Sequence, residues 1–209
     1  MATQTQTPTR PEQNQTVEKR IQKVRELYAA GPELGKTALE NLLAELTSGK
    51  SEAGSRMGSA GRVGRRQGTV SELTMIAPFV PGGAARLRAL LELRDGDFST
   101  TDRVGTVHDM RFVFLDNDTK LLFATAYDGD WDAYIDDFVV KIADDLDALF
   151  STWEGWPGIH NPAVKDWIAE HQIPAAGWYV AHPDLTVRDI RRLKRVGKEL
   201  DEFLDKINS

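Results

Sequence analysis

The side chains best suited to chemistry in this chain are its four histidines and one of its arginines, Arg111. The histidines are His108, His160, His171 and His182, and none of them forms the HxH or HExxH spacing of a zinc site. The chain has no cysteine, which excludes disulfides, thiolate ligands and a cysteine nucleophile. The sequence therefore predicts no dedicated metal site, and any chemistry would rest on single imidazoles.

His108 and Arg111 lie in a predicted strand from Val104 to Leu115, so alternation places them on opposite faces. His108 then shares its face with three apolar side chains, which are Met110, Phe112 and Phe114. An apolar cavity with one imidazole suits a haem or a flat aromatic ligand. The alternative is a core histidine hydrogen-bonded to a backbone carbonyl. Arg111 either forms an ion pair with Asp109 on its own face or anchors a substrate carboxylate or haem propionate.

His160 is in an aromatic loop before a predicted helix from Pro162 to His171, and His171 lies at the end of that helix. Either could be an axial haem ligand, since a neutral imidazole beside apolar side chains is what iron ligation requires. The alternative for His171 is an interaction with the C-terminus of its own helix. Trp153 and Trp156 are in the loop before this helix, where they either belong to the core or form the rim of a site for an apolar or aromatic ligand.

Composition limits the classes of partner. The chain has 209 residues, 41% of them hydrophobic, which allows one ordinary domain with appendages. It carries 26 basic and 32 acidic side chains, and the net charge of −6 opposes binding to nucleic acid. No stretch reads as a signal peptide or a membrane span. We therefore expect a cytoplasmic protein.

The chain divides into four predicted segments. Residues 1–15 have the composition of a disordered tail, and residues 16–47 form a helical hairpin. Residues 48–68 are rich in Gly, Ser and Arg and predict a basic flexible linker, or else a basic loop that orders over an anionic ligand or an acidic partner. Residues 69–209 form an α+β domain that ends in a long helix beginning at Thr186, where Asp189 completes a capping pattern.

The α+β domain has the element order β-α-β-β-α-β. Its strands are predicted at Thr69 to Ala77, Val104 to Leu115, Thr119 to Tyr127 and Ala176 to Ala181, with a tight turn at residues 116–118. This order predicts a ferredoxin-like antiparallel sheet with strand order 4-1-3-2 and helices on one face. The second face would be covered by a second copy of the chain, so we expect a homodimer.

A helix with one broad apolar stripe is predicted to run through residues 131–149. The stretch from Asp128 to Leu149 contains eight aspartates and one lysine. They form either a solvated acidic face or a docking surface for a basic segment, such as the arginine linker of a second subunit.

The region from Thr69 to Pro183 resembles the dimeric α+β barrel superfamily, which includes dye-decolourising peroxidases, chlorite dismutases and cofactor-free monooxygenases. The resemblance rests on the element order, on the predicted hairpin, and on the runs HDMRFVFLDNDTKLLFATAYDGDWDAYIDDF and EGWPGIHNPAVKDWI. It implies a barrel-forming homodimer. The GxxDG motif of the peroxidases is represented by Thr125-Ala126-Tyr127-Asp128-Gly129, where threonine replaces the first glycine.

Two functional hypotheses follow. In the first, which the resemblance implies, the protein is a haem-dependent, peroxidase-like oxidoreductase that acts on a small aromatic or apolar substrate. In the second, it is a non-catalytic ligand-binding or assembly protein that dimerises through the barrel and uses its helical termini to contact partners. The sequence alone does not decide whether the chain is an enzyme.

Overall fold

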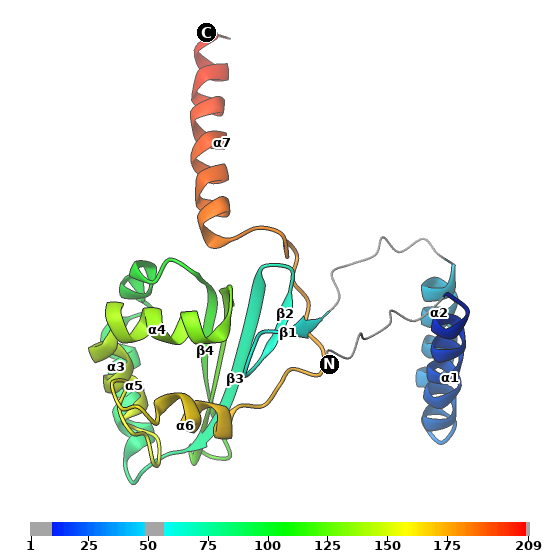
Figure 1. Ribbon diagram of the computed structural model, residues 1–209, viewed down its shortest axis with the longest axis horizontal. Helices are drawn as coiled ribbons and strands as arrows, with labels where there is room; N and C mark the ends of the chain where they lie inside the picture. Colours follow the sequence, from blue (N-terminus) through cyan, green and yellow to red (C-terminus); the bar gives the residue numbers. More distant parts are fainter. Residues whose placement is uncertain (1–9, 49–56, 208–209) are drawn as a thin grey trace, which may run out of the picture. The chain divides into compact units, whose positions relative to one another are not determined.

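A computed structural model describes residues 10–48 and 57–207 of the chain. The chain divides into two compact units, Met1–Gly54 and Ser55–Ser209, which we call the hairpin unit and the sheet unit. Each unit is described by itself (Figure 1).

The hairpin unit consists of helices α1 (Arg10–Tyr28) and α2 (Glu33–Thr47). The helices are separated at Gly31 and Pro32, as the sequence predicts. Residues 10–15, which we expected to belong to a disordered tail, are the first residues of α1, and residues 1–9 lie outside the described part. In α2, Leu39 and Leu43 are buried, whereas Leu34, Leu42 and Leu46 remain exposed.

The sheet unit is an α+β structure built on one antiparallel sheet with strand order β1-β2-β3-β5-β4. The central β3-β5-β4 order is the 1-3-2 arrangement that we predicted for the first three strands. The turn between β4 and β5 uses three consecutive residues with positive φ, Asp116, Asn117 and Asp118. The strands are β1 (Gly58–Ser59), β2 (Arg65–Gln67), β3 (Val70–Pro78), β4 (Val107–Leu115) and β5 (Lys120–Asp128).

The predicted fourth strand, Ala176 to Ala181, does not form. Chain from the end of the preceding helix does run antiparallel to β3, but it contributes only an isolated bridge between Met75 and Gln172 and a hydrogen bond from Ile173 N to Thr74 O of 2.8 Å. Pro174 follows at once and has no N–H to continue a ladder. The edge position beside the start of β3 is instead held by β2.

The β1–β2 hairpin therefore incorporates residues from the segment that we expected to be a flexible linker. Its arginines contact the acidic surface of the same unit: Arg66 Nη1 lies 2.8 Å from Asp130 Oδ1, and Arg62 pairs with Asp166. Of these aspartates only Asp130 belongs to the stretch from Asp128 to Leu149, and docking of the arginine segment of a second subunit onto that stretch stays a prediction.

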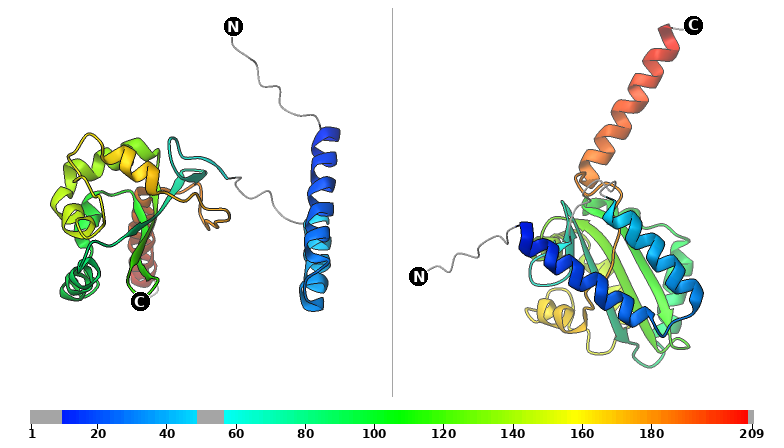
Figure 2. Two further views of the ribbon diagram at one scale, coloured as in Figure 1. Left: turned by 90° about the horizontal axis from the view of Figure 1, so that it is seen from below. Right: turned by 90° about the vertical axis from the view of Figure 1, so that its right-hand side faces the viewer.

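Helices α3, α4, α5 and α6 cover one face of the sheet (Figure 2). The core between the two layers includes Leu73, Met75, Phe123, Trp131 and Phe138, all buried. The short 3-10 helix η1 (Ser99–Arg103) precedes β4. The bounds of the covering helices are α3 (Gly83–Arg94), α4 (Trp131–Lys141), α5 (Ala143–Phe150) and α6 (Val164–His171).

The helix that we predicted as continuous over residues 131–149 is broken at Ile142, whose backbone has φ −145° and ψ 37°. The break places Asp144 and Asp145 in the first turn of α5. Anionic side chains are favourable at that position because the helix dipole is positive there. In one continuous helix these aspartates would lie near the C-terminus, where the dipole disfavours them.

The second face of the sheet is not uniformly apolar. Since Met110, Phe112 and Phe114 pack against the core, alternation assigns Asp109, Arg111 and Val113 to the other face. Val113 is 43% exposed, and Arg111 and Asp109 form an exposed ion pair. Pairing of two such sheets into a barrel stays a prediction.

Helix α7 (Val187–Ile207) completes the unit and leads away from the sheet (Figure 1). Its predicted cap is formed: the Thr186 hydroxyl accepts from Asp189 N at 3.1 Å, and the Asp189 carboxylate accepts from Thr186 N at 3.1 Å. The Thr186 hydroxyl also donates to the Asp189 carboxylate, and this hydrogen bond, together with the one from Thr186 N, holds the pKa of Asp189 below its usual range. Across the described residues, no helix combines the length and apolar character needed to cross a membrane.

Candidate functional site

His108 lies at an irregularity of the sheet. The pairing of β4 with β5 shifts register between Val107 and Asp109, so His108 is an extra residue that the alternation argument did not foresee. Its Nε2 is 2.7 Å from Asp128 Oδ1, and both side chains are largely buried. The other Asp128 oxygen accepts a 2.8 Å hydrogen bond from Val187 N. His108 and Asp128 therefore connect β4 and β5 to the first residue of α7.

Arg111 takes the ion-pair alternative. Its Nε lies 2.9 Å from Asp109 Oδ2, and the two side chains are 62% and 46% exposed. His108 and Arg111 do not contact each other in these interactions: His108 pairs with Asp128, and Arg111 pairs with Asp109. A joint catalytic role for the two residues stays a prediction.

The two predicted haem ligands have different surroundings. His160 is exposed, whereas His171 is partly buried and stacks on Trp167 with ring centroids 3.9 Å apart. His171 Nδ1 lies 2.8 Å from the Trp167 carbonyl oxygen. A carbonyl only accepts hydrogen bonds, so Nδ1 carries the proton. This contact fits the alternative in which His171 interacts with the end of its own helix. Among the described residues, no three or more His, Cys, Asp or Glu side chains cluster as metal ligands would.

The four predicted ligand-binding aromatics are packed on the helix side of the sheet. Phe112 contacts Phe123 and Phe150, and Phe114 stacks on Phe79. Trp153 is 1% exposed, and the Trp156 indole donates to Asp147 Oδ1 at 2.8 Å. The aromatic loop therefore packs against the core of its own chain, and its role as a ligand rim stays a prediction.

One cavity on this side of the sheet is too small for a haem. It measures about 20 Å³ and is lined by core residues such as Leu73, Phe123 and Phe150. Pockets for small organic ligands are typically about 300 Å³ or more. Neither His160 nor His171 lines this cavity, so haem binding by these residues stays a prediction.

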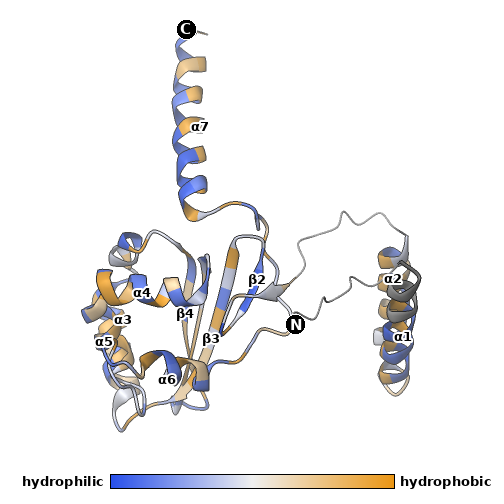
Figure 3. Cartoon of the chain, in the orientation of Figure 1, coloured by the Kyte–Doolittle hydropathy of each residue, from blue (hydrophilic) through white to orange (hydrophobic). Residues whose placement is uncertain are grey.

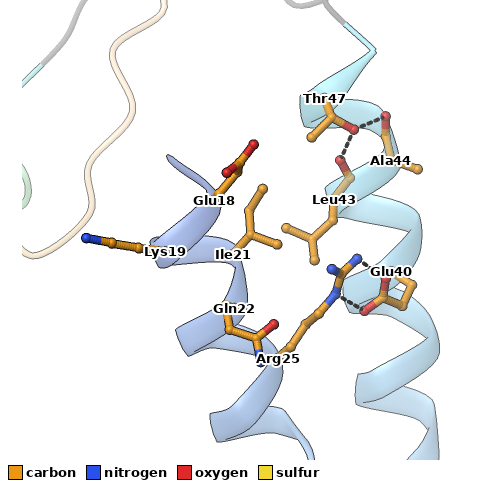
Figure 4. A pocket seen from close by; sticks show the side chains of 9 residues that line it. All are labelled: Glu18, Lys19, Ile21, Gln22, Arg25, Glu40, Leu43, Ala44 and Thr47. Carbon is orange, nitrogen blue, oxygen red and sulfur yellow. Dashed lines mark hydrogen bonds and ion pairs between the residues drawn. The ribbon is translucent and has the colours of Figure 1, made fainter. Parts of the chain in front are cut away.

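A larger depression lies within the hairpin unit, between α1 and α2 (Figure 4). It is an open groove of about 590 Å³ with Ile21, Leu43 and Ala44 on its walls. Arg25 and Glu40 bridge the two helices through hydrogen bonds of 2.8 and 2.7 Å. The Arg25 hydrogen bond lowers the pKa of Glu40, and Glu40 raises the pKa of Arg25.

A basic hollow of about 400 Å³ lies at the beginning of α7. It is lined by Gly105 and by four arginines at helical spacing: Arg188, Arg191, Arg192 and Arg195. Arg191 is paired with Asp102 at 2.5 Å. The i, i+3, i+4, i+7 spacing of the arginines is visible in the sequence. The position of Gly105 beside them, in the connection between η1 and β4, is not. Guanidinium groups in this arrangement can bind carboxylates or other anions.

The rest of α7 carries an apolar stripe that its own unit leaves uncovered (Figure 3). Six side chains of the stripe are between 42% and 61% exposed: Leu193, Val196, Leu200, Phe203, Leu204 and Ile207. We call these residues the α7 stripe. They recur at intervals of three and four residues, the spacing of helices that pair along their length.

Comparison with known proteins gives no relative. No protein-family model, no curated protein and no solved structure matches the chain.

Proposed function

We propose that this protein is a non-catalytic assembly protein that associates with a second copy of itself through α7. The observation that carries the proposal is the α7 stripe, in which six large apolar side chains are about half exposed or more along one helix. Isolated apolar residues on a surface are ordinary, but a continuous stripe marks an interaction surface.

Energetic considerations support this role for the stripe. Full burial of one large apolar side chain contributes roughly 1.5–3 kcal/mol, so covering the half-exposed residues of the stripe contributes about 1 kcal/mol each. Helix α7 has few contacts with the sheet that could stabilise it, because every residue from Arg191 to Ile207 is exposed. Most helical stability in proteins comes from packing of an apolar face. A partner that covers the stripe would supply that packing.

The packing and side-chain contacts of the sheet unit are consistent with a structural role. Its core is filled, His108 and Asp128 fasten α7 to the sheet, and Arg111 is held by Asp109. These contacts explain the candidate catalytic residues without a substrate. The sheet unit would thus serve as a base from which α7 projects.

Sedimentation velocity of the full chain, over a wide concentration range, tests the proposal. We expect a reversible dimer that Leu200→Ser weakens by about tenfold or more in Kd, since both copies lose an apolar contact. Leu93→Ser is the matched control, because it makes the same change at a leucine of α3 that is 82% exposed and lies outside the α7 stripe. Circular dichroism would confirm that both variants keep their helices.

Two results would contradict the proposal. One is a monomer at every concentration. The other is a dimer whose Kd is the same for the wild-type chain and for Leu200→Ser.

A further inference from the structure

The charges of α7 are divided along its length. Residues 188–198, the basic half, carry six cationic side chains and one anionic side chain; residues 199–207, the acidic half, carry four anionic and one cationic. The cations of the basic half are Arg188, Arg191, Arg192, Lys194, Arg195 and Lys198. The anions of the acidic half are Glu199, Asp201, Glu202 and Asp205.

This division does not stabilise α7 as a single helix. Asp189 in the first turn and Lys206 in the last turn suit the helix dipole, but the six cations of the basic half lie toward the N-terminus and the four anions of the acidic half toward the C-terminus, which is the reverse of the order that the dipole favours. The ion pair between Lys198 and Glu202 also has the less favourable order, with the cation nearer the N-terminus. The charge pattern therefore requires an explanation outside the helix itself.

The sheet unit neutralises only part of the basic half. Arg191 is paired with Asp102, but both side chains are at least half exposed, and pairs of this kind contribute little. Arg188, Arg192 and Arg195 line the same hollow as Arg191. Their clustering leaves a strongly positive surface beside the start of the α7 stripe.

We propose that two copies of α7 pair antiparallel, with the basic half of each beside the acidic half of the other and the two α7 stripes buried between them. This inference rests on the proposed function and specifies its geometry. Antiparallel pairing brings opposite charges together at both ends of the helix pair. Parallel pairing would set six cations beside six cations, and four anions beside four.

The placement of α7 in the sheet unit agrees with this geometry. Asp128 of β5 and Asp102 of η1 hold the beginning of the helix, which then leads away from the sheet (Figures 1 and 2). A helix of this length spans roughly 30 Å. In an antiparallel pair the two sheet units lie at opposite ends, so that neither obstructs the other.

Cysteine cross-linking tests the orientation, because the chain has no cysteine of its own. Leu193→Cys is introduced in one batch of full-length chain and Ile207→Cys in a second batch that carries a mass tag. These residues lie at opposite ends of the α7 stripe. Under mild oxidation we expect the mixture to give mainly the mixed disulfide, which joins the cysteine at position 193 of one batch to the cysteine at position 207 of the other. Each batch oxidised alone should give little disulfide-linked dimer.

A control separates helix pairing from random collision. Adding Leu200→Ser to both cysteine variants should remove the mixed product if the product depends on the paired stripes. A mixed product that persists at the same yield would overturn the inference.

The outcomes distinguish this inference from the proposed function. Disulfides that form within each batch, with little mixed product, would show parallel pairing and overturn the inference while the assembly function stands. A wild-type chain that remains monomeric would overturn both.

Discussion

Asp128 shows how one residue of a suspected catalytic motif acquires a structural role. In the sequence it occupies the aspartate position of a peroxidase-like GxxDG run. In the structure one of its oxygens bonds to His108 Nε2 at 2.7 Å and the other accepts from Val187 N at 2.8 Å. An anionic acceptor at the first residue of a helix stabilises that helix. Asp128 therefore ties α7 to the sheet.

Replacement of Asp128 by alanine should lower stability. The change leaves the partly buried His108 and the Val187 N–H without their acceptor, a loss of roughly 1–3 kcal/mol. Asp109→Ala is the matched control: it removes an exposed ion pair in the same sheet and should change the free energy of unfolding by less than about 0.5 kcal/mol. Urea unfolding measures both, and equal effects would show that Asp128 does not fasten α7.

At this scale the sequence predicted local pairs better than it predicted sites. The Thr186–Asp189 cap and the Arg111–Asp109 pair both involve neighbours along the chain, and both are confirmed. His108 was assigned to a face by strict alternation, but the register shift beside it breaks that rule. Its partner Asp128 lies on the next strand, and sequence spacing does not reveal such a contact.

Among the elements, the β1–β2 hairpin was the least predictable. Its residues have no apolar periodicity, so the sequence favoured a linker. The hairpin is held by contacts with distant residues: the buried Glu72 carboxylate accepts from Arg65 N at 2.9 Å and from Ala175 N at 3.2 Å. Elements with their own periodicity, such as β3 and α7, were predicted well. The break at Ile142 lies inside one continuous stripe and left no signal.

Gly64 should be essential for the hairpin. It has φ +80°, and a Cβ built there would lie 1.9 Å from the Glu72 carbonyl oxygen. Gly64→Ala therefore adds a steric clash to the roughly 1 kcal/mol cost of positive φ, and should destabilise by about 2 kcal/mol or more. Gly129→Ala, with φ +88° and no atom within 4 Å of the new Cβ, isolates the backbone cost. In thermal unfolding, the Tm of Gly64→Ala should be clearly lower than the Tm of Gly129→Ala. The reverse order would contradict this account of the hairpin.

For the whole molecule, the sequence predicted an α+β sheet with one face covered by helices, and this is confirmed. It also predicted that a second copy would cover the other face, which depends on a partner that one chain does not contain. The exposed pair of Arg111 and Asp109 shows that part of that face is polar. The larger uncovered apolar surface is the α7 stripe, so α7 is the stronger candidate for self-association.

Hydrogen exchange along α7, measured at low and high protein concentration, tests the central claim most directly. If a second copy covers the α7 stripe, amides from Leu193 to Ile207 should exchange slowly at high concentration and much faster on dilution, while amides of β3 and β5 stay equally protected at both. Fast exchange of α7 at both concentrations would show that nothing covers the stripe. Equally slow exchange at both, in samples that sedimentation shows to be monomeric at the lower concentration, would show that this chain covers the stripe by itself. Either result would contradict association through α7.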